Sequence, residues 1–460
     1  MKTNVFLLVG SSLMSVASMA EERPNVIVII ADQWSTSLSD GSGIYSTGVR
    51  TPNVDRLASQ GVRFEQSYST YPLSTPARAC FYTGLYPHKN KAIFNENLSV
   101  LKDSLPANVQ TMGRLFAEAG YETAYFGKQH AANYAGDGIQ EFGSMIYSDG
   151  GMLAEGSAYD QIFLRDAISF LEREHDKPFY MNLSLINPHD ICKVIGGKVK
   201  GATFADAIHF CREDDELYLR YQKRIGLPGN FNIPYVPGMI LDKDFMYTEV
   251  FSQSENDWKR YISTYCLLME NTDWLIGLLL DAVDKAGLSE NTIVVFTTDH
   301  GDMMGSHKLI AKTTFYEESA KTMMCIRYPK KINAGSVNEE ALVGSIDLMP
   351  TLLDMCNIDI PASLDGRSFK EQCYYSDKNG KHEILYSMNY FGRMVRFGDY
   401  KYVRTSVYGK EFNILFDLKK DPQEANNVFN QIGYEQVSSE AKRLLDNFLQ
   451  REKLGLIFKR

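Results

Sequence analysis

The chain has 460 residues, of which 44% are hydrophobic and 23% are charged, and its formal net charge is −9. This composition excludes a collagen, a coiled coil and an extended disordered chain. The acidic balance argues against a protein that binds nucleic acids or other polyanions over its whole surface. Because the length exceeds that of a usual single core, we expect one large domain with a smaller one attached.

The first twenty residues have the features of a signal peptide. Lys2 supplies a positive start, residues 5–16 are mostly apolar, and small residues at Ser18 and Ala20 form a cleavage site. An uncleaved membrane anchor is the alternative, but the apolar stretch is shorter than a spanning helix needs. No later run is long and apolar enough to cross a bilayer, and no cysteine near the cleavage point offers a lipid anchor. We therefore expect an exported protein, periplasmic or secreted, without a stable membrane anchor.

The cysteines are spread too widely for a disulfide scaffold, and none forms a Cys-x-x-Cys pair typical of zinc or redox sites. An oxidising compartment would allow a bridge that closes an inserted loop between Cys192 and Cys211, but the sequence does not decide the pairing. The seven positions are Cys80, Cys192, Cys211, Cys266, Cys325, Cys356 and Cys373.

Strands and helices alternate through the first two thirds of the chain. A wholly apolar, β-branched run at residues 25–31 predicts a strand buried on both faces of a parallel sheet. Thr51 and Pro52 begin a helix that stops at Gly61. The alternation continues with helix 108–120, strand 122–126, helix 159–174, strand 179–186, helix 258–286 and strand 292–298. This order predicts an α/β fold with a large mixed, mainly parallel central sheet flanked by helices.

Two regions depart from this alternation. Residues 192–251 are rich in Gly, Lys, Pro and aromatic residues, which indicates a long insertion that could wall a pocket. Beyond about residue 370 we predict a small α+β subdomain with short strands and a terminal amphipathic helix, at residues 384–389, 393–397, 400–404 and 435–453. The chain therefore divides into a signal peptide, a main domain and a C-terminal subdomain, over residues 1–20, 21–370 and 371–460.

Polar residues directly after the predicted strands are the first candidates for a functional site. In open α/β sheets, ligands gather at the carboxyl ends of the strands. Four apolar runs end in this way, at Asp32, Lys128, Asn187 and Asp299.

The segment from Ser74 to Gly84 carries the most informative pattern. Ser74 precedes Arg78 by four residues with Pro76 between them, which places a hydroxyl at a helix start and a guanidinium one turn along, an arrangement suited to an anion. Taken alone, Ser-x-Pro-x-Arg is more often a simple helix cap.

With the following Thr83 and Gly84, the segment resembles the signature of the type I sulfatases of the alkaline phosphatase-like superfamily. In that family a Cys or Ser before x-Pro-x-Arg is converted to formylglycine. The resemblance implies that a maturing enzyme oxidises Ser74, as in bacterial serine-type sulfatases. A hydrated aldehyde attacks sulfur and later ejects sulfate by collapsing to the aldehyde, which a serine hydroxyl cannot do.

Two further motifs resemble the metal-binding segments of the family. Asp32 and Gln33 correspond to the first metal pair and Asp299 and His300 to the second, and Ser74 is the fifth expected metal residue. Oxygen ligands favour calcium. Gln33 stands where a second Asp is frequent and His300 where Asn is frequent, and a nitrogen ligand also suits manganese or zinc. The resemblance implies one divalent ion, with calcium as our choice.

Histidines and lysines after the other strands resemble the family's acid–base and charge-balancing residues. Lys128 and His130 match a Gly-Lys-x-His motif, which implies that Lys128 neutralises sulfate and that His130 accepts a proton during breakdown of the covalent ester. His189, in Asn-Pro-His-Asp, is the expected general acid, and Asp190 an expected substrate contact.

The segment from His307 to Glu317 adds a third cation. Lys312 resembles the family lysine that contacts the bridging sulfate oxygen, and it is expected to balance charge together with Arg78. His307 is a further candidate substrate contact, with a surface-loop position as the equal alternative. Four other histidines match no motif and are expected to be surface or packing residues: His88, His175, His209 and His382.

Taken together, the resemblance implies a sulfatase that hydrolyses a sulfate ester on a sulfated carbohydrate such as a glycosaminoglycan fragment. Gln33 and His300 also resemble the related phosphonate monoester and phosphodiester hydrolases, which are the nearest alternative. An inactive glycan-binding homologue is a second alternative, against which the complete set of candidate residues argues.

Overall fold

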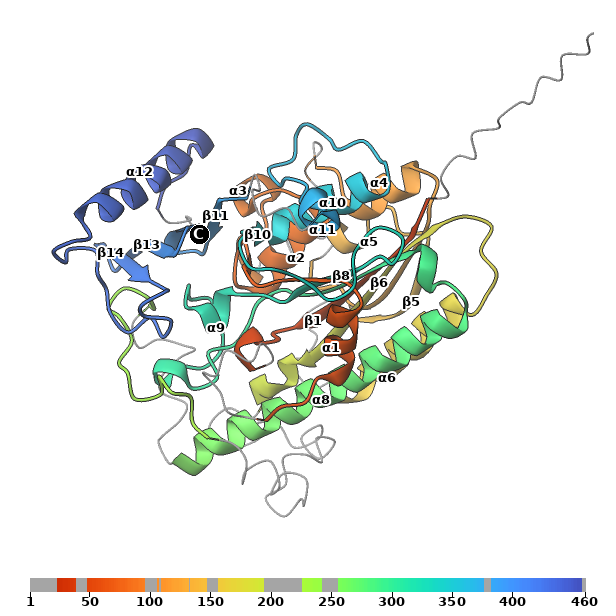
Figure 1. Ribbon diagram of the computed structural model, residues 1–460, viewed down its shortest axis with the longest axis horizontal. Helices are drawn as coiled ribbons and strands as arrows, with labels where there is room; N and C mark the ends of the chain where they lie inside the picture. Colours follow the sequence, from red (N-terminus) through yellow and green to blue (C-terminus); the bar gives the residue numbers. More distant parts are fainter. Residues whose placement is uncertain are drawn as a thin grey trace, which may run out of the picture.

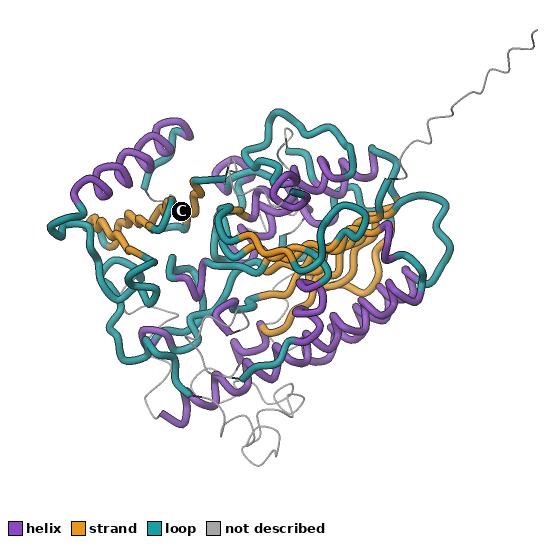
Figure 2. Tube along the Cα trace, viewed as in Figure 1, coloured by secondary structure: helices purple, strands orange, loops and turns teal. Residues whose placement is uncertain are grey.

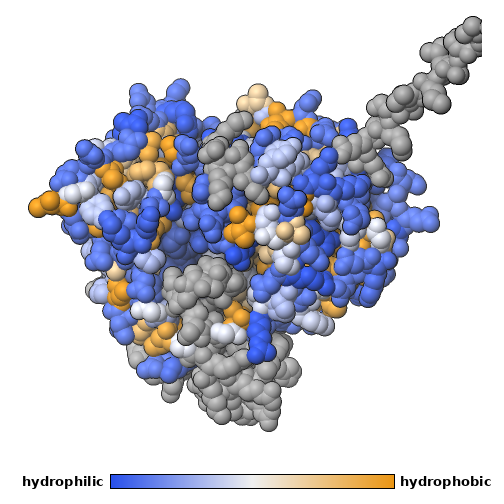
Figure 3. All heavy atoms as spheres, in the orientation of Figure 1, coloured by the Kyte–Doolittle hydropathy of each residue, from blue (hydrophilic) through white to orange (hydrophobic). Residues whose placement is uncertain are grey.

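The computed structural model describes residues 23–38, 48–95, 106, 109–131, 133–146, 156–193, 226–241, 255–375 and 382–456. The expected signal peptide, Cys211, His209 and most of the expected insertion lie outside these residues. Among the described residues, no helix is long and apolar enough to cross a membrane. On the face in Figure 3 the coloured surface is mainly hydrophilic, with hydrophobic groups scattered over it.

An eight-stranded sheet forms the centre of the molecule, in the order β5-β4-β6-β1-β7-β8-β2-β9 (Figure 2). Strand β1 (Asn25–Asp32) pairs in parallel with both β6 (Phe179–Pro188) and β7 (Thr292–Thr298). Strand β4 (Glu122–Lys128) is parallel to β6, whereas β8 (Met324–Arg327) is antiparallel to β7. The outer strands are β5 (Glu141–Ile146), β2 (Val62–Phe64) and β9 (Ser336–Asn338). The predicted mixed, mainly parallel sheet is confirmed.

Helices cover both faces of this sheet (Figure 1). On one face lie α1 (Pro52–Ser59), α6 (Gly156–Leu171) and α8 (Glu255–Lys285). On the other lie α2 (Ser74–Thr83), α4 (Met112–Glu118) and α10 (Leu348–Met355).

The burial of β1 on both faces explains why its sequence is apolar throughout. Ile27 and Ile29 belong to the hydrophobic cluster on the α1, α6 and α8 side, whereas Val28 and Ile30 belong to the cluster on the opposite side. Successive side chains of a strand point to opposite faces, so a strand covered on both faces needs an apolar residue at every position.

A second, antiparallel sheet lies near the C-terminus, where three short strands were predicted and the structure has four. It consists of β11 (Ile384–Met388), β12 (Gly392–Phe397), β13 (Tyr400–Val407) and β14 (Lys410–Asp417), and α12 (Glu435–Glu452) lies beside it (Figure 1). The remaining short helices and strands are α3 (Pro87–Asn90), α5 (Asn133–Gly136), α9 (Glu317–Ala320), α11 (Lys370–Tyr374), β3 (Ser67–Tyr68) and β10 (Val343–Gly344).

All the predicted helices and strands of the main domain are present, with ends displaced by four residues or fewer. The sequence prediction missed β14, four strands of the central sheet (β2, β5, β8 and β9) and the separate pair β3 and β10. Strand β14 begins exposed and becomes buried only in its second half, so it carries no continuous alternation. The outer strands are short and depend on pairing with distant segments, which local sequence does not reveal.

A buried lysine joins the small sheet to the main domain. The Lys401 ammonium, on β13, lies 2.5 Å from a carboxylate oxygen of Glu317 and 2.8 Å from one of Glu424. It also donates to the backbone oxygen of Phe315. The Lys401 side chain is fully buried, so the attraction between these opposite charges has to compensate for their loss of hydration.

We expect Lys401→Met to lower the free energy of unfolding by about 3–5 kcal/mol, because the buried Glu424 and the mostly buried Glu317 lose their shared cation. Urea unfolding followed by circular dichroism measures this loss. Lys419→Met is the matched control, since the Lys419 side chain is 76% exposed, and its unfolding should match that of the wild type. Equal stability of the two variants would contradict the role of the cluster.

Candidate active site

Side chains from the carboxyl ends of the central strands meet in one buried centre. Asp32 ends β1, Lys128 ends β4, and Asp299 and His300 follow β7. Helix α2 begins at Ser74 and brings this residue to the same place, where its hydroxyl lies 2.9 Å from His300 Nε2 and 3.5 Å from Asp32 Oδ1. These five side chains are all buried. The prediction from strand ends therefore locates the centre.

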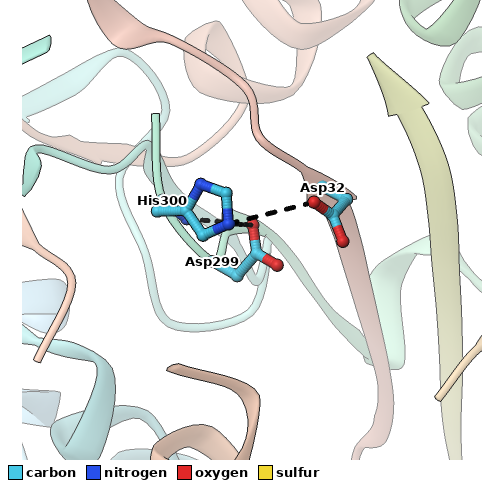
Figure 4. A group of neighbouring side chains, drawn as sticks. All are labelled: Asp32, Asp299 and His300. Carbon is cyan, nitrogen blue, oxygen red and sulfur yellow. Dashed lines mark hydrogen bonds and ion pairs between the residues drawn. The ribbon is translucent and has the colours of Figure 1, made fainter. Parts of the chain in front are cut away.

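Three of these residues form a group that fits a metal ion. One potential ligand atom each of Asp32, Asp299 and His300 lies within 4.8 Å of the others (Figure 4). His300 Nδ1 lies 2.9 Å from the carbonyl oxygen of Gly301, which leaves Nε2 as the ring acceptor facing Ser74. Burial lowers the pKa of His300 to about 4. The ring is therefore neutral near pH 7 and able to bind a cation.

Arg78 spans the two carboxylates. Its Nη2 donates to Asp32 Oδ2 at 3.0 Å and its Nε to Asp299 Oδ2 at 3.1 Å. Its Nη1 donates to Ser184 Oγ at 2.6 Å and to the backbone oxygen of Lys128 at 3.2 Å. The planar guanidinium thus fixes residues from three strands at once, which a lysine could not do.

The Asp32 carboxylate is surrounded by positive charge. Lys128 Nζ lies 2.7 Å from Asp32 Oδ2. Burial by itself would raise the pKa of Asp32, but the neighbouring Lys128 and Arg78 cations hold this pKa well below its usual range. Burial lowers the pKa of Lys128, and the nearby Asp32 charge partly offsets this effect. The centre therefore keeps an ionised carboxylate beside two cations.

The two candidate acid–base histidines lie close to these cations. His130 follows β4 and His189 follows β6, and both are about nine-tenths buried or more. Burial, then Lys128, lowers the pKa of each well below the usual range, and Lys312 acts in the same direction. His189 Nε2 lies 3.9 Å from the thiol sulfur of Cys192. Both rings are therefore neutral when no anion balances the lysines.

Gln33 lies beside the metal group, but its side chain has other partners. Lys312 Nζ donates to Gln33 Oε1, and the Cys192 thiol lies 3.6 Å from the same oxygen. Gln33 Nε2 donates to Asp302 Oδ2 at 2.5 Å, and Tyr261 donates to the same carboxylate oxygen at 3.0 Å. The Gln33 carboxamide oxygen, which was expected to bind the metal, is thus already bonded to Lys312.

Asp302, Tyr261 and Cys192 are further parts of this centre that were not predicted from the sequence. Asp302 had a signal, since it is the second acid of the Asp-His-Gly-Asp segment. Tyr261 lies within the amphipathic helix α8 and looks like any buried aromatic residue. Only the packing of α8 against the sheet brings its hydroxyl to the site.

The two residues expected to contact the substrate, His307 and Asp190, also contact other segments of the protein. The His307 ring stacks on Tyr316 with ring centres 4.3 Å apart, and its Nδ1 lies 3.2 Å from the carbonyl oxygen of Ile233. The Asp190 carboxylate accepts hydrogen bonds from the start of α6, at Gly156 and Ser157. Both side chains are therefore held by neighbouring segments of the chain.

The remaining described histidines have partners away from the centre. His175 Nδ1 lies 2.7 Å from Glu122, and His88 Nε2 lies 3.4 Å from Glu452. His382 Nε2 lies 3.2 Å from the carbonyl oxygen of Ser368. These contacts agree with the expected packing and surface roles.

The fold and the site define an α/β enzyme whose buried, highly charged centre lies at the carboxyl edge of the sheet. The family model described as Sulfatase matches residues 24–358, and a second, described as N-sulphoglucosamine sulphohydrolase, C-terminal, matches residues 305–451. The chain belongs to the sulfatase family and is a sulfuric ester hydrolase.

Its relatives include two enzymes of Bacteroides thetaiotaomicron. A Delta 4,5-hexuronate-2-O-sulfatase is 29% identical, with 96% of this chain and 92% of the relative covered. An N-acetylglucosamine-6-O-sulfatase is 28% identical, with coverages of 96% and 90%. The solved structure of a 2-O glycosaminoglycan sulfatase has a TM-score of 0.77 at 27% identity and covers 95% of each chain. The similarity thus extends over the whole main domain and the C-terminal sheet.

Proposed function

We propose that this sulfatase removes sulfate from a sulfated saccharide, such as a glycosaminoglycan fragment, with Ser74 converted to formylglycine and one calcium ion at the site. The observation that carries the proposal is the position of Ser74, whose hydroxyl lies 2.9 Å from His300 Nε2 inside the candidate metal group. The sugar class is supported by relatives that act on sulfated hexuronate and N-acetylglucosamine.

Asp32, Asp299 and His300 would hold the ion, with position 74 beside it. Two buried carboxylates and a neutral imidazole form a donor set that suits a divalent cation. We leave Gln33 outside this set, because Lys312 already bonds its carboxamide oxygen. When bound, the ion supplies Lewis-acid polarisation of the sulfate group, and formylglycine supplies the nucleophile.

Lys128 and Lys312 bind and orient the sulfate in this scheme. Lys128 is fully buried beside Asp32, so its charge is little screened by water. Lys312, which bonds Gln33, stabilises the negative charge that develops on the bridging oxygen. Each such contact is worth about 3–4 kcal/mol in comparable transition states.

His189 donates the proton to the departing alcohol, and His130 accepts one when the covalent ester breaks down. Burial and the two lysines lower the pKa of His189 when the site holds no anion. The negative charge of a bound sulfate ester opposes this effect, so substrate binding favours the protonated ring that a general acid needs.

The test is the mass of the proteolytic peptide that carries Ser74, from protein produced in its native host or with a maturing enzyme. A peptide lighter by two hydrogens that reacts with an aldehyde reagent supports the proposal. An unmodified serine in active protein would overturn the proposed nucleophile. Rates on matched sulfate and phosphonate esters test the nearest alternative, and binding of a sulfated glycan without turnover would support an inactive homologue.

Removal of the metal should reduce activity about 100-fold or more, because the sulfate loses its Lewis acid. We expect chelation to lower the melting temperature as well, since a bound ion stabilises only the folded state. Calcium should restore both properties. Restoration by manganese or zinc alone would change the proposed ion, and full activity after verified metal removal would contradict a metal requirement.

The location of the protein is part of the proposal. The apolar stretch and the small-residue cleavage site within residues 1–20 support export across the bacterial inner membrane. Cell fractionation, together with the N-terminal sequence of the mature protein, tests it. A mature chain that begins near residue 21 supports export.

A further inference from the structure

Asp160, a buried residue of α6, binds the backbone that leads to His189. Its carboxylate accepts hydrogen bonds from the backbone nitrogens of Ile186 at 2.8 Å and Asn187 at 3.0 Å. These two residues lie near the end of β6, which Pro188 completes directly before the turn that carries His189. The Asp160 side chain therefore fixes the last backbone groups before the proposed general acid.

Asp190 makes the reciprocal connection from the other side of His189. Its carboxylate accepts from the backbone nitrogens of Gly156 at 3.1 Å and Ser157 at 2.8 Å, and from the Ser157 hydroxyl at 2.9 Å. The first backbone N–H groups of a helix have no partner inside the helix, so a carboxylate there is favourable. Helix α6 and the turn thus each supply a carboxylate to the backbone of the other.

The two segments are also in close steric contact. A Cβ added at Gly156 would lie 2.8 Å from Cγ of Asn187, which is too close for any side chain. Asp160 and Asp190 are both fully buried. Hydrogen bonds that satisfy a buried carboxylate cannot be replaced by water without rearrangement, so this junction holds the turn in one position.

The imidazole of His189 is not held by strong bonds of its own. Among the described residues, its Nδ1 has no hydrogen-bond partner, and its Nε2 contacts the Cys192 sulfur at 3.9 Å. The direction of the ring therefore depends mainly on the backbone that carries it. That backbone is bracketed by the bonds to Asp160 and Asp190.

We propose that Asp160 and Asp190 are positioning residues that hold the His189 ring for proton transfer to the departing alcohol. The inference rests on the general-acid role proposed above for His189. It gives Asp190 a role in which it acts through His189, in place of direct contact with the substrate.

The test compares two leaving groups in the matured, metal-containing enzyme. Departure of 4-nitrophenolate needs little protonation, whereas a sugar alkoxide needs a general acid. We expect Asp190→Asn and Asp160→Asn to lower kcat on a sulfated saccharide by about 10- to 100-fold, with 4-nitrophenyl sulfate affected less than about 3-fold. KM should change little, because no contact with the substrate is removed.

A control and a milder variant make the result specific. Asp166→Asn changes a carboxylate of the same helix that accepts from Ser144 N at 2.9 Å and Ser144 Oγ at 2.6 Å, away from the turn, and should leave both rates near wild type. Ser157→Ala removes one of the three bonds to Asp190 and should show the same selectivity to a smaller extent. Ser157→Ala provides the test of positioning if an aspartate variant does not fold.

Adding Asp190→Asn to His189→Ala should cause no further selective loss of activity on the saccharide, because Asp190 acts through His189. Equal losses on both substrates, no loss on either, or a further selective loss in the double variant would each overturn the positioning role. If the matured wild type hydrolyses no sulfate ester, the proposed function fails instead. If His189→Ala is as active as wild type on the saccharide, the general-acid role fails, and the two failures are thereby distinguished.

Discussion

Ser74→Ala should abolish turnover, by about 10⁴-fold or more, while the protein remains folded. The large loss is expected because alanine cannot be oxidised to an aldehyde and offers no nucleophile. The fold should tolerate the change, since Leu73 is the N-cap of α2 and the Ser74 hydroxyl contacts His300 and Asp32 within the centre. Steady-state kinetics on a sulfate ester and urea unfolding of the same preparation measure the two effects.

Ser74→Cys distinguishes loss of the nucleophile from damage to the site. A maturing enzyme that oxidises cysteine would produce the same formylglycine from this variant, so activity should return when the two proteins are made together. Substantial activity of Ser74→Ala would rule out position 74 as the nucleophile. Inactivity of a correctly matured Ser74→Cys would show that the loss has another cause.

Arg78→Met should reduce both stability and activity. Methionine fills a similar volume but leaves Asp32 and Asp299 without the guanidinium that spans them. Breaking such a buried pair costs about 3–5 kcal/mol. We also expect kcat to fall by about 100-fold or more, because the carboxylates no longer keep their positions around Ser74. Urea unfolding of metal-free protein gives the first quantity and kinetics of the metal-containing protein gives the second.

The control for Arg78 is an arginine with a similar bond on the surface. Arg114 bonds Asp137, but its side chain is 48% exposed. Arg114→Met should therefore cost less than about 1 kcal/mol and leave kcat unchanged. Arg78→Lys should recover only part of the stability, since one ammonium cannot form the parallel bonds of a guanidinium. Equal effects at positions 78 and 114 would contradict the account of the buried cluster.

Much of the site was predictable because its residues lie where apolar strands stop. Asp32, Lys128 and Asp299 each end or follow a strand whose burial is indicated by a continuous apolar run of residues. Parallel neighbours place such ends at one edge of the sheet, so the local pattern is enough to gather them. The Ser74 segment added the proposed nucleophile through its resemblance to a family signature.

Contacts between distant segments were not predictable in the same way. Gln33 was expected to contact the metal, yet its carboxamide bonds Lys312 and Asp302. His307 and Asp190 were expected to contact the substrate, yet Tyr316 packs against the first and the start of α6 binds the second. A motif gives the type of a residue and its place on a strand, but not the partner that reaches it from elsewhere in the chain.

The sequence by itself determined the α/β class, the buried central strands and the family to which the site residues belong. These features depend on local periodicity and on short motifs, both of which are continuous in the chain. Only the tertiary structure decided that Arg78 spans two carboxylates, that Asp302, itself bonded by Tyr261, holds Gln33, and that two aspartates bracket His189. Those arrangements depend on which helix packs on which strand end, and that choice is made by burial over the whole fold.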